Sequence, residues 1–251
     1  LTDKAYEKYQ QALKIAPDNG FLHLALADYY KVKGNKVAVF EEVKKAFSSD
    51  EIDLESKIRI LYNNYVDTNE QNIKSEAITL SNILIDKYPS DPKVYSIRGD
   101  FLYLLDKKKE ACDLYKKALV VNKANYPIWE QLARIQLSLS DFKATEETCT
   151  EALQHFPDKV LLYLFNGIAK TQNGNPSGAI EAYKQGLTYT QGNKDLTAQF
   201  YANMGDTYHA MGNYPESDKA YESSLSLDYD NALVLNNYSY YLSLRGKDLL
   251  K

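Results

Sequence analysis

The chain has 251 residues, of which 44% are hydrophobic and 25% charged, and its net charge is −4. This balance is typical of a folded globular protein and excludes a disordered one. No apolar run approaches the roughly 18 residues of a membrane span. Two cysteines are too few for a disulfide framework or a four-thiolate zinc site. With 11 glycines and 7 prolines the chain has few turns, which favours helices over an all-β fold. None of these figures explains the 22 tyrosines.

A repeat of 34 residues organises the sequence. In most units a small residue marks one reference position. Three other kinds of residue recur at fixed distances from it: a tyrosine three residues before, a glycine nineteen before and a proline five after. Such a period predicts stacked structural units, each too small to bury its apolar face alone. The reference positions, mostly small residues, are 34 or 38 residues apart: Ala12, Ala46, Leu84, Ala118, Ala152, Gly186 and Ser224.

Each unit is predicted to be a pair of antiparallel helices. The first helix ends at a turn in which glycine adopts the left-handed conformation and Asn or Asp caps the next helix. These turns are Gly34-Asn35, Ser140-Asp141, Gly174-Asn175 and Gly212-Asn213. The second helix ends before a proline, which cannot continue it.

The pattern resembles the tetratricopeptide repeat family, whose units show an aromatic, Leu-Gly, Tyr, Gly, Ala, aromatic, Ala and Pro in this order. One unit supplies Trp129, Leu132-Ala133, Phe142, Ala152 and Pro157, and another supplies Tyr201, Met204-Gly205, Tyr208, Gly212, Tyr214 and Tyr221. The match covers almost the whole chain. The resemblance implies an all-α fold, a right-handed α-solenoid whose concave groove is lined by the first helices and binds extended peptides or partner helices.

In chain order, we expect a partial repeat at 1–19 that holds a lone second helix (about 3–16). Six full repeats follow at 20–53, 54–91, 92–125, 126–159, 160–197 and 198–231. A partial repeat at 232–251 holds a lone first helix (about 232–245). This single array has about fourteen helices, and its abrupt ends indicate a fragment of a longer protein. Four extra residues are expected in the loop 67–72 and four near 191–194.

The resemblance also implies which side chains face the groove. Asn203 and Asn237 are 34 residues apart, and an amide there suits a peptide bond because it donates and accepts at once; the alternative is that both merely bridge neighbouring helices. The expected groove contacts are Lys93, Asp100, Tyr103, Arg134, Asn203, Asp206, His209, Asn236, Asn237 and Tyr240. Receptors of acidic chaperone tails need Lys, Arg and Asn on consecutive first helices, and this chain has Asp28, Asp100 and Asp206 instead.

The aromatic positions of the repeat account for ten tyrosines, which we expect to pack between helices. Tyr103 and Tyr240 lie outside this pattern and remain candidate contacts. Cys112 and Cys149 are expected to pack as small apolar residues. The ten tyrosines are Tyr9, Tyr30, Tyr95, Tyr115, Tyr163, Tyr183, Tyr201, Tyr208, Tyr214 and Tyr221.

These features predict a non-enzymatic scaffold or adaptor that binds a protein or peptide, with no catalytic, cofactor-binding or metal-binding residues. The sequence has no GxxxxGK[ST], GxGxxG or HExxH motif. Nucleic acid is not expected as a partner, because acidic residues surround Lys107-Lys108-Lys109 and Lys116-Lys117. Two alternatives stay open: a docking or regulatory array of a longer enzyme, and a lipid-anchored protein of the bacterial cell envelope. The second rests on a composition of four Arg against 26 Lys and on the segment 232–242, which looks like long bacterial tetratricopeptide proteins. Localisation is therefore cytoplasm or cell envelope, and the sequence does not identify the partner.

Overall fold

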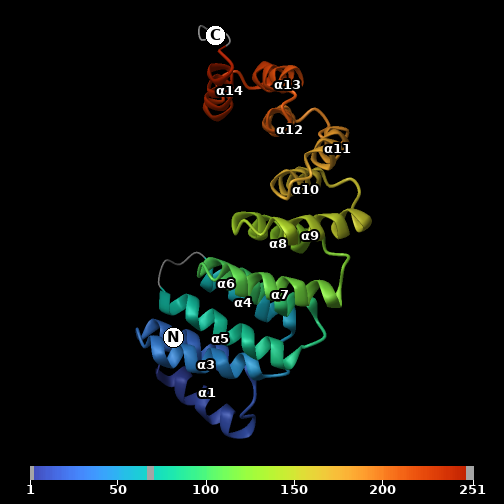
Figure 1. Ribbon diagram of the computed structural model, residues 1–251. Helices are drawn as coiled ribbons and strands as arrows, with labels where there is room; N and C mark the ends of the chain where they lie inside the picture. The colour runs from blue at the N-terminus through green and yellow to red at the C-terminus, as the bar shows by residue number, and fades with distance from the viewer. Residues whose placement is uncertain (1–2, 67–70, 247–251) are drawn as a thin grey trace. The chain divides into compact units, whose positions relative to one another are not determined.

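The computed structural model describes residues 3–66 and 71–246. In these ranges the chain forms fourteen helices and no strand (Figure 1), which confirms the predicted all-helical fold of stacked helix pairs. The chain divides into two compact units, Leu1–Asn122 and Lys123–Lys251, and each is described by itself. No helix in the described ranges is long and apolar enough to cross a membrane.

The first unit contains α1 to α7. Consecutive helices pack in pairs, α2 against α3 and α6 against α7, and α5 contacts both α3 and α6. The core of this unit includes Phe47, Leu61 and Phe101, all of them fully buried. The bounds are α1 (Asp3–Ile15), α2 (Gly20–Val32), α3 (Lys36–Ser48), α4 (Leu54–Tyr65), α5 (Gln71–Lys87), α6 (Pro92–Leu104) and α7 (Lys108–Val121).

The second unit contains α8 to α14. Its pairs are α8 with α9, α10 with α11, and α12 with α13. The first helices also stack on one another, because α10 contacts both α8 and α12, and α12 contacts α14. The bounds are α8 (Tyr126–Ser138), α9 (Phe142–His155), α10 (Val160–Gln172), α11 (Pro176–Leu187), α12 (Lys194–Ala210), α13 (Tyr214–Leu227) and α14 (Ala232–Leu244).

The turns between paired helices have the predicted geometry. Gly34, Gly174 and Gly212 have φ angles of 73°, 78° and 72°, a region that glycine enters without steric cost. Asn35 and Asn175 cap the next helix through the side-chain oxygen. Asn213 makes no such bond.

Of the two expected insertions, the loop 67–72 lies largely outside the described residues. The other is the turn 188–193, in which Gln191 and Gly192 both have positive φ angles. Asn193 then caps α12 by accepting from Leu196 N at 3.0 Å.

Tyrosines from second helices lie over glycines of first helices. Tyr115, Tyr183 and Tyr221 are each only 1% exposed. A Cβ added at Gly167 would lie 2.2 Å from Tyr183 Cε1, so the ring occupies the space that any larger residue needs. Gly99 and Gly205 have the same relation to Tyr115 and Tyr221.

Most of the ten tyrosines expected between helices are buried or partly buried. Tyr214 differs, since it is 41% exposed. It lies at the start of α13, where its ring faces the Arg245 guanidinium at 5.0 Å. The Cys112 and Cys149 side chains are buried, as expected.

Candidate functional site

A pocket of about 420 Å³ opens where the first helices of the second unit stack. Its lining comes from Ile168 of α10, from α12 and from the first half of α14, together with Tyr221 of α13. Three of the predicted groove residues, Asn203, Asp206 and Asn237, line this one pocket. The full lining is Ile168, Asp195, Gln199, Ala202, Asn203, Asp206, Tyr221, Asp228, Asn231, Leu233, Val234 and Asn237.

Asp206 is the most constrained polar group of the pocket. Its Oδ1 accepts a short hydrogen bond from the Tyr221 hydroxyl and a longer one, 3.4 Å, from Asn237 Nδ2. Burial raises the pKa of the Asp206 carboxyl, while the bonds from Tyr221 and Asn237 oppose that rise. Asp206 Oδ2 accepts no hydrogen bond from any described residue. The carboxylate is therefore fixed by one oxygen and open at the other.

The two asparagines keep free hydrogen-bonding capacity. Asn203 Nδ2 donates to Gln199 O, one turn earlier in α12, at 2.8 Å. Asn237 Nδ2 has only the 3.4 Å contact with Asp206. Neither side-chain oxygen accepts a bond from a described residue, so each amide retains an acceptor for a ligand in the pocket.

Two further aspartates lie at the ends of helices around the pocket. Asp195 is in the first turn of α12. Asp228 precedes α14, and its Oδ2 accepts a 2.7 Å bond from the N-cap residue Asn231. A helix start carries roughly half a positive charge. Asp228 also caps the C-terminus of α13, where the partial charge is negative, so these helix ends offset only a small part of the charge of the three carboxylates, and the pocket stays negative.

The other predicted residues of the second unit lie elsewhere. His209 stacks on Tyr241 with ring centroids 3.6 Å apart, and burial followed by the nearby Arg245 lowers the pKa of its imidazole. Asn236 is exposed, as is Tyr240, at 58%. Arg134 forms a 2.6 Å ion pair with Glu130 and lies 5.3 Å from the Phe165 ring. None of these four lines the pocket.

Two of the three predicted residues of the first unit, Lys93 and Asp100, have partners already. Lys93 pairs with Glu55 of α4. Asp100 accepts from Tyr115 at 2.6 Å through Oδ1 and from Tyr62 at 2.7 Å through Oδ2. Both of its oxygens are therefore used, although Asp100 occupies the same repeat position as Asp206. Tyr103 is 37% exposed.

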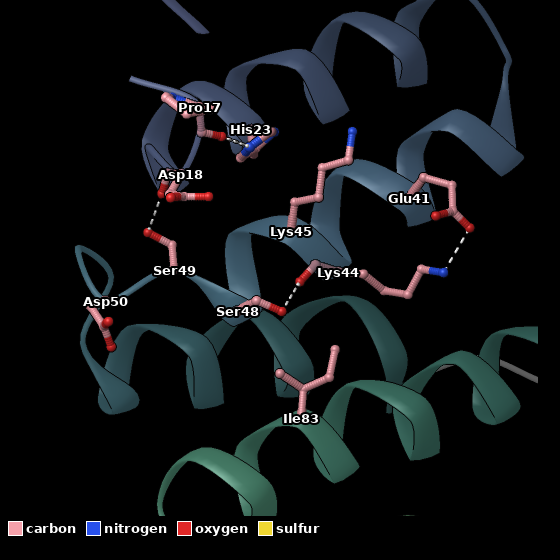
Figure 2. A pocket seen from close by; sticks show the side chains of 10 residues that line it. All are labelled: Pro17, Asp18, His23, Glu41, Lys44, Lys45, Ser48, Ser49, Asp50 and Ile83. Carbon is pink, nitrogen blue, oxygen red and sulfur yellow. Dashed lines mark hydrogen bonds and ion pairs between the residues drawn. The ribbon is translucent and has the colours of Figure 1, made fainter. Parts of the chain in front are cut away.

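A larger cavity, about 700 Å³, lies in the first unit. Figure 2 shows it between the α1–α2 turn, α3 and α5, with Ile83 pointing from α5 toward α3. Lys44 pairs with Glu41 at 2.7 Å.

The remaining polar groups of this cavity also bond to one another. His23 contacts Glu42 at 2.6 Å and Pro17 O at 2.8 Å, and Ser49 donates to Asp18 O at 2.7 Å. These pairs hold the turn against α3. The cavity contains none of the predicted groove residues, so the smaller pocket is the better candidate site.

Sequence reasoning missed the pocket residues at the helix starts. Asp195, Asp228 and Asn231 lie outside the four groove positions that the family geometry assigns to a first helix. Their signal in the sequence is the Asx residues that flank the starts of α12 and α14, which predict caps rather than contacts. In the described part of the chain, no three His, Cys, Asp or Glu side chains converge as metal ligands.

Comparison with known proteins agrees with this architecture. The family model described as tetratricopeptide repeat matches residues 198–231, which include most of α12 and all of α13. The structure of YrrB, titled a TPR protein with an unusual peptide-binding site, superposes with a TM-score of 0.63 at 18% identity, over 77% of this chain and 96% of that one. At such low identity the likeness establishes the fold. Residues 198–231 thus match the tetratricopeptide repeat, and the fold of the chain is that of tetratricopeptide repeat proteins.

Two curated relatives are longer than this chain. The human protein O-mannosyl-transferase TMTC3 is 26% identical over 187 residues, which cover 74% of this chain and 20% of that protein. The TPR repeat-containing protein MJ1428 of Methanocaldococcus jannaschii is 24% identical over 162 residues, 61% of this chain and 28% of that protein. The match thus spans less than a third of either relative.

Proposed function

We propose that this chain is a non-enzymatic scaffold that binds an extended segment of a protein or peptide in the pocket between α10, α12 and α14. One observation carries the proposal: Asn203, Asp206 and Asn237, predicted independently as groove contacts, line the same pocket. A peptide-binding site in YrrB, a protein of the same fold, supports this mode of recognition.

The chemistry of the pocket suits a peptide backbone. Asn203 lies on α12 and Asn237 on α14, so two amides approach a bound segment from neighbouring helices. An amide pairs with the N–H and the C=O of a peptide bond. Ile168, Ala202 and Val234 supply apolar surface for side chains. A segment that enters with its backbone toward the amides would satisfy its own polar groups as it loses water.

Binding rather than catalysis is the proposed role. The Tyr221 hydroxyl is committed to Asp206, and burial raises the pKa of this phenol far above its usual value, which makes it a poor nucleophile. The acidic lining also opposes binding of a phosphate backbone, so the proposal excludes nucleic acid from this pocket.

The test is selection of peptides from a displayed random library against the whole chain. We expect the double variant Asn203→Ala/Asn237→Ala to lose at least about tenfold in affinity for the selected peptides, as expected for two lost hydrogen bonds. The matched control is Asn64→Ala, because Asn64 Nδ2 makes the same bond to the residue one turn earlier, Ile60 O at 2.8 Å, in the other unit. Peptides whose binding is indifferent to the double variant would contradict the proposal.

One finding favours a second candidate, a docking array of a longer protein: the curated relatives extend well beyond the matched region. The complete reading frame distinguishes the two. An enzymatic domain joined to residues 1–251 would favour the docking array, and further repeats alone would favour the scaffold.

A further inference from the structure

The pocket between α10, α12 and α14 has one acceptor that the fold leaves open. Asp206 Oδ2 accepts no bond from a described residue, while Oδ1 is held by Tyr221 and Asn237. The free protein already bears the free-energy cost of partly desolvating this carboxylate and fixing its orientation. A ligand that donates a hydrogen bond to the open oxygen would therefore stabilise it.

Asp100 in the first unit shows what a closed version of this arrangement looks like. Both aspartates follow a glycine that lies under a tyrosine ring, Gly99 under Tyr115 and Gly205 under Tyr221. At Asp100 the second oxygen is bonded by Tyr62 at 2.7 Å. No tyrosine takes that place at Asp206. The open oxygen is therefore particular to the pocket and does not come with the repeat.

The remaining lining indicates the charge of the missing donor. Asp195 and Asp228 add two carboxylates, and no lysine, arginine or histidine among the described residues lines the pocket. The lining also includes apolar groups, among them Ile168, Ala202 and Val234. Lysine and arginine side chains combine an aliphatic stem with a cationic head, so an apolar wall that leads to a carboxylate fits them.

A metal ion fits the same residues poorly. In the described part of the chain the pocket carboxylates do not converge into a group of three ligands. Asp228 already accepts from Asn231 at 2.7 Å. A cation on a long, flexible side chain can reach Asp206 without needing that convergence.

We propose that this pocket selects a lysine or arginine side chain of the bound segment, whose cationic head donates to Asp206 Oδ2 while Asn203 and Asn237 hold the backbone beside it. The inference rests on the peptide-binding function proposed above and names the chemistry of its partner: a basic segment.

The test uses labelled peptide mixtures of fixed central residue and random flanks, with blocked ends, against the whole chain. The central residue is lysine, arginine, Nε-acetyllysine, norleucine or glutamate. We expect the lysine or arginine mixture to bind about tenfold tighter than the norleucine and acetyllysine mixtures, as a charge-assisted bond provides. Asp206→Asn should remove this preference, so that the lysine, arginine and norleucine mixtures bind with equal affinity.

Asp100→Asn is the matched control, because it makes the same change at a carboxylate whose two oxygens both accept hydrogen bonds within the fold. It should leave the preference for basic mixtures intact. The salt dependence of binding is measured on the unmodified chain, so its result does not depend on whether the variants fold. Raising the salt from about 50 to 500 mM shortens the screening length severalfold, so the preference for the basic mixtures should shrink. A preference for the basic mixtures that persists in Asp206→Asn overturns the inference.

The outcomes separate the two proposals. If all mixtures bind equally and Asn203→Ala still weakens them, the groove function stands and the basic specificity is wrong. A preference for glutamate overturns the specificity as well. If no mixture binds, or if Asn203→Ala changes nothing, the proposed function fails and this inference fails with it.

Discussion

Replacing Gly167 by alanine tests how the second unit is packed. The added Cβ would lie 2.2 Å from Tyr183 Cε1 and 2.6 Å from two further ring atoms. The ring has little room to retreat, because Tyr183 is buried and its edge packs against Phe200, with centroids 6.1 Å apart. Either α10 or α11 must therefore shift.

Overpacking of this kind costs about 1–3 kcal/mol, and alanine in a helix interior returns about 1 kcal/mol relative to glycine. The clash at Gly167 is severe, so we expect Gly167→Ala to lower the free energy of unfolding by about 2 kcal/mol. For a chain of this length that corresponds to a fall of about 4–8 °C in the melting temperature. Gly99→Ala and Gly205→Ala, whose nearest contacts are 2.9 Å, should cost less.

Thermal and urea unfolding followed by far-UV circular dichroism measures this effect. The control is Gly178→Ala, whose Cβ would meet only the side chain of Asn175, the N-cap of α11; it should cost at most about 1 kcal/mol, the value of such a cap. Gly167→Ala combined with Tyr183→Leu should cost less than the sum of the two single changes, because the clash is gone. If Gly167→Ala is as stable as the unmodified chain, the tyrosine ring does not set the spacing of these helices.

Three further predictions concern charges and pH. Arg245 donates to both oxygens of Asp218, at 2.5 and 3.1 Å. Arg245→Ala removes these charge-assisted bonds, worth about 1.5–3 kcal/mol, and should speed amide exchange throughout α14. Arg59→Ala, which replaces an exposed arginine, is the control and should not change this exchange. Burial lowers the pKa of Lys57 to about 8. The unfolded chain, in which the lysine has its ordinary pKa of 10.5, therefore binds more protons between these values, and stability should rise with pH in this window; pH-dependent urea unfolding should show that Lys57→Met lacks this rise. Burial raises the pKa of Tyr183 to about 12 from 10.0, so this group should make stability fall from pH 10 to 12. Tyr183→Phe should flatten that fall in alkaline unfolding curves, and an unchanged slope would exclude Tyr183 as its source.

The helices and their turns were predictable from the sequence because they depend on local chemistry. A Gly-Asn turn requires only a positive φ angle at the glycine and an Asn that caps the helix after it, as at Gly174-Asn175. The convergence of Asn203 and Asn237 was also predictable, since residues 34 apart occupy equivalent places on stacked helices. The exposure of Tyr214 was not, because the repeat gives its position and not how closely its neighbours cover it.

The difference between Asp100 and Asp206 could not be read from the repeat. They occupy the same repeat position, and each accepts from the tyrosine fifteen residues later. Their second partners come from unlike places: Tyr62 lies on α4, whose sequence fits the repeat poorly, and Asn237 lies on α14. Which carboxylate stays open depends on those neighbouring side chains, and the period of the sequence carries no information about them.

The central claim is that a peptide segment binds between α10, α12 and α14. Hydrogen–deuterium exchange of the whole chain, with and without a peptide selected from the displayed library, tests it most directly. We expect slower exchange at 195–206 and 231–237, with little change around the first-unit cavity of Figure 2. Protection confined to that cavity, with α12 and α14 unaffected, would contradict it.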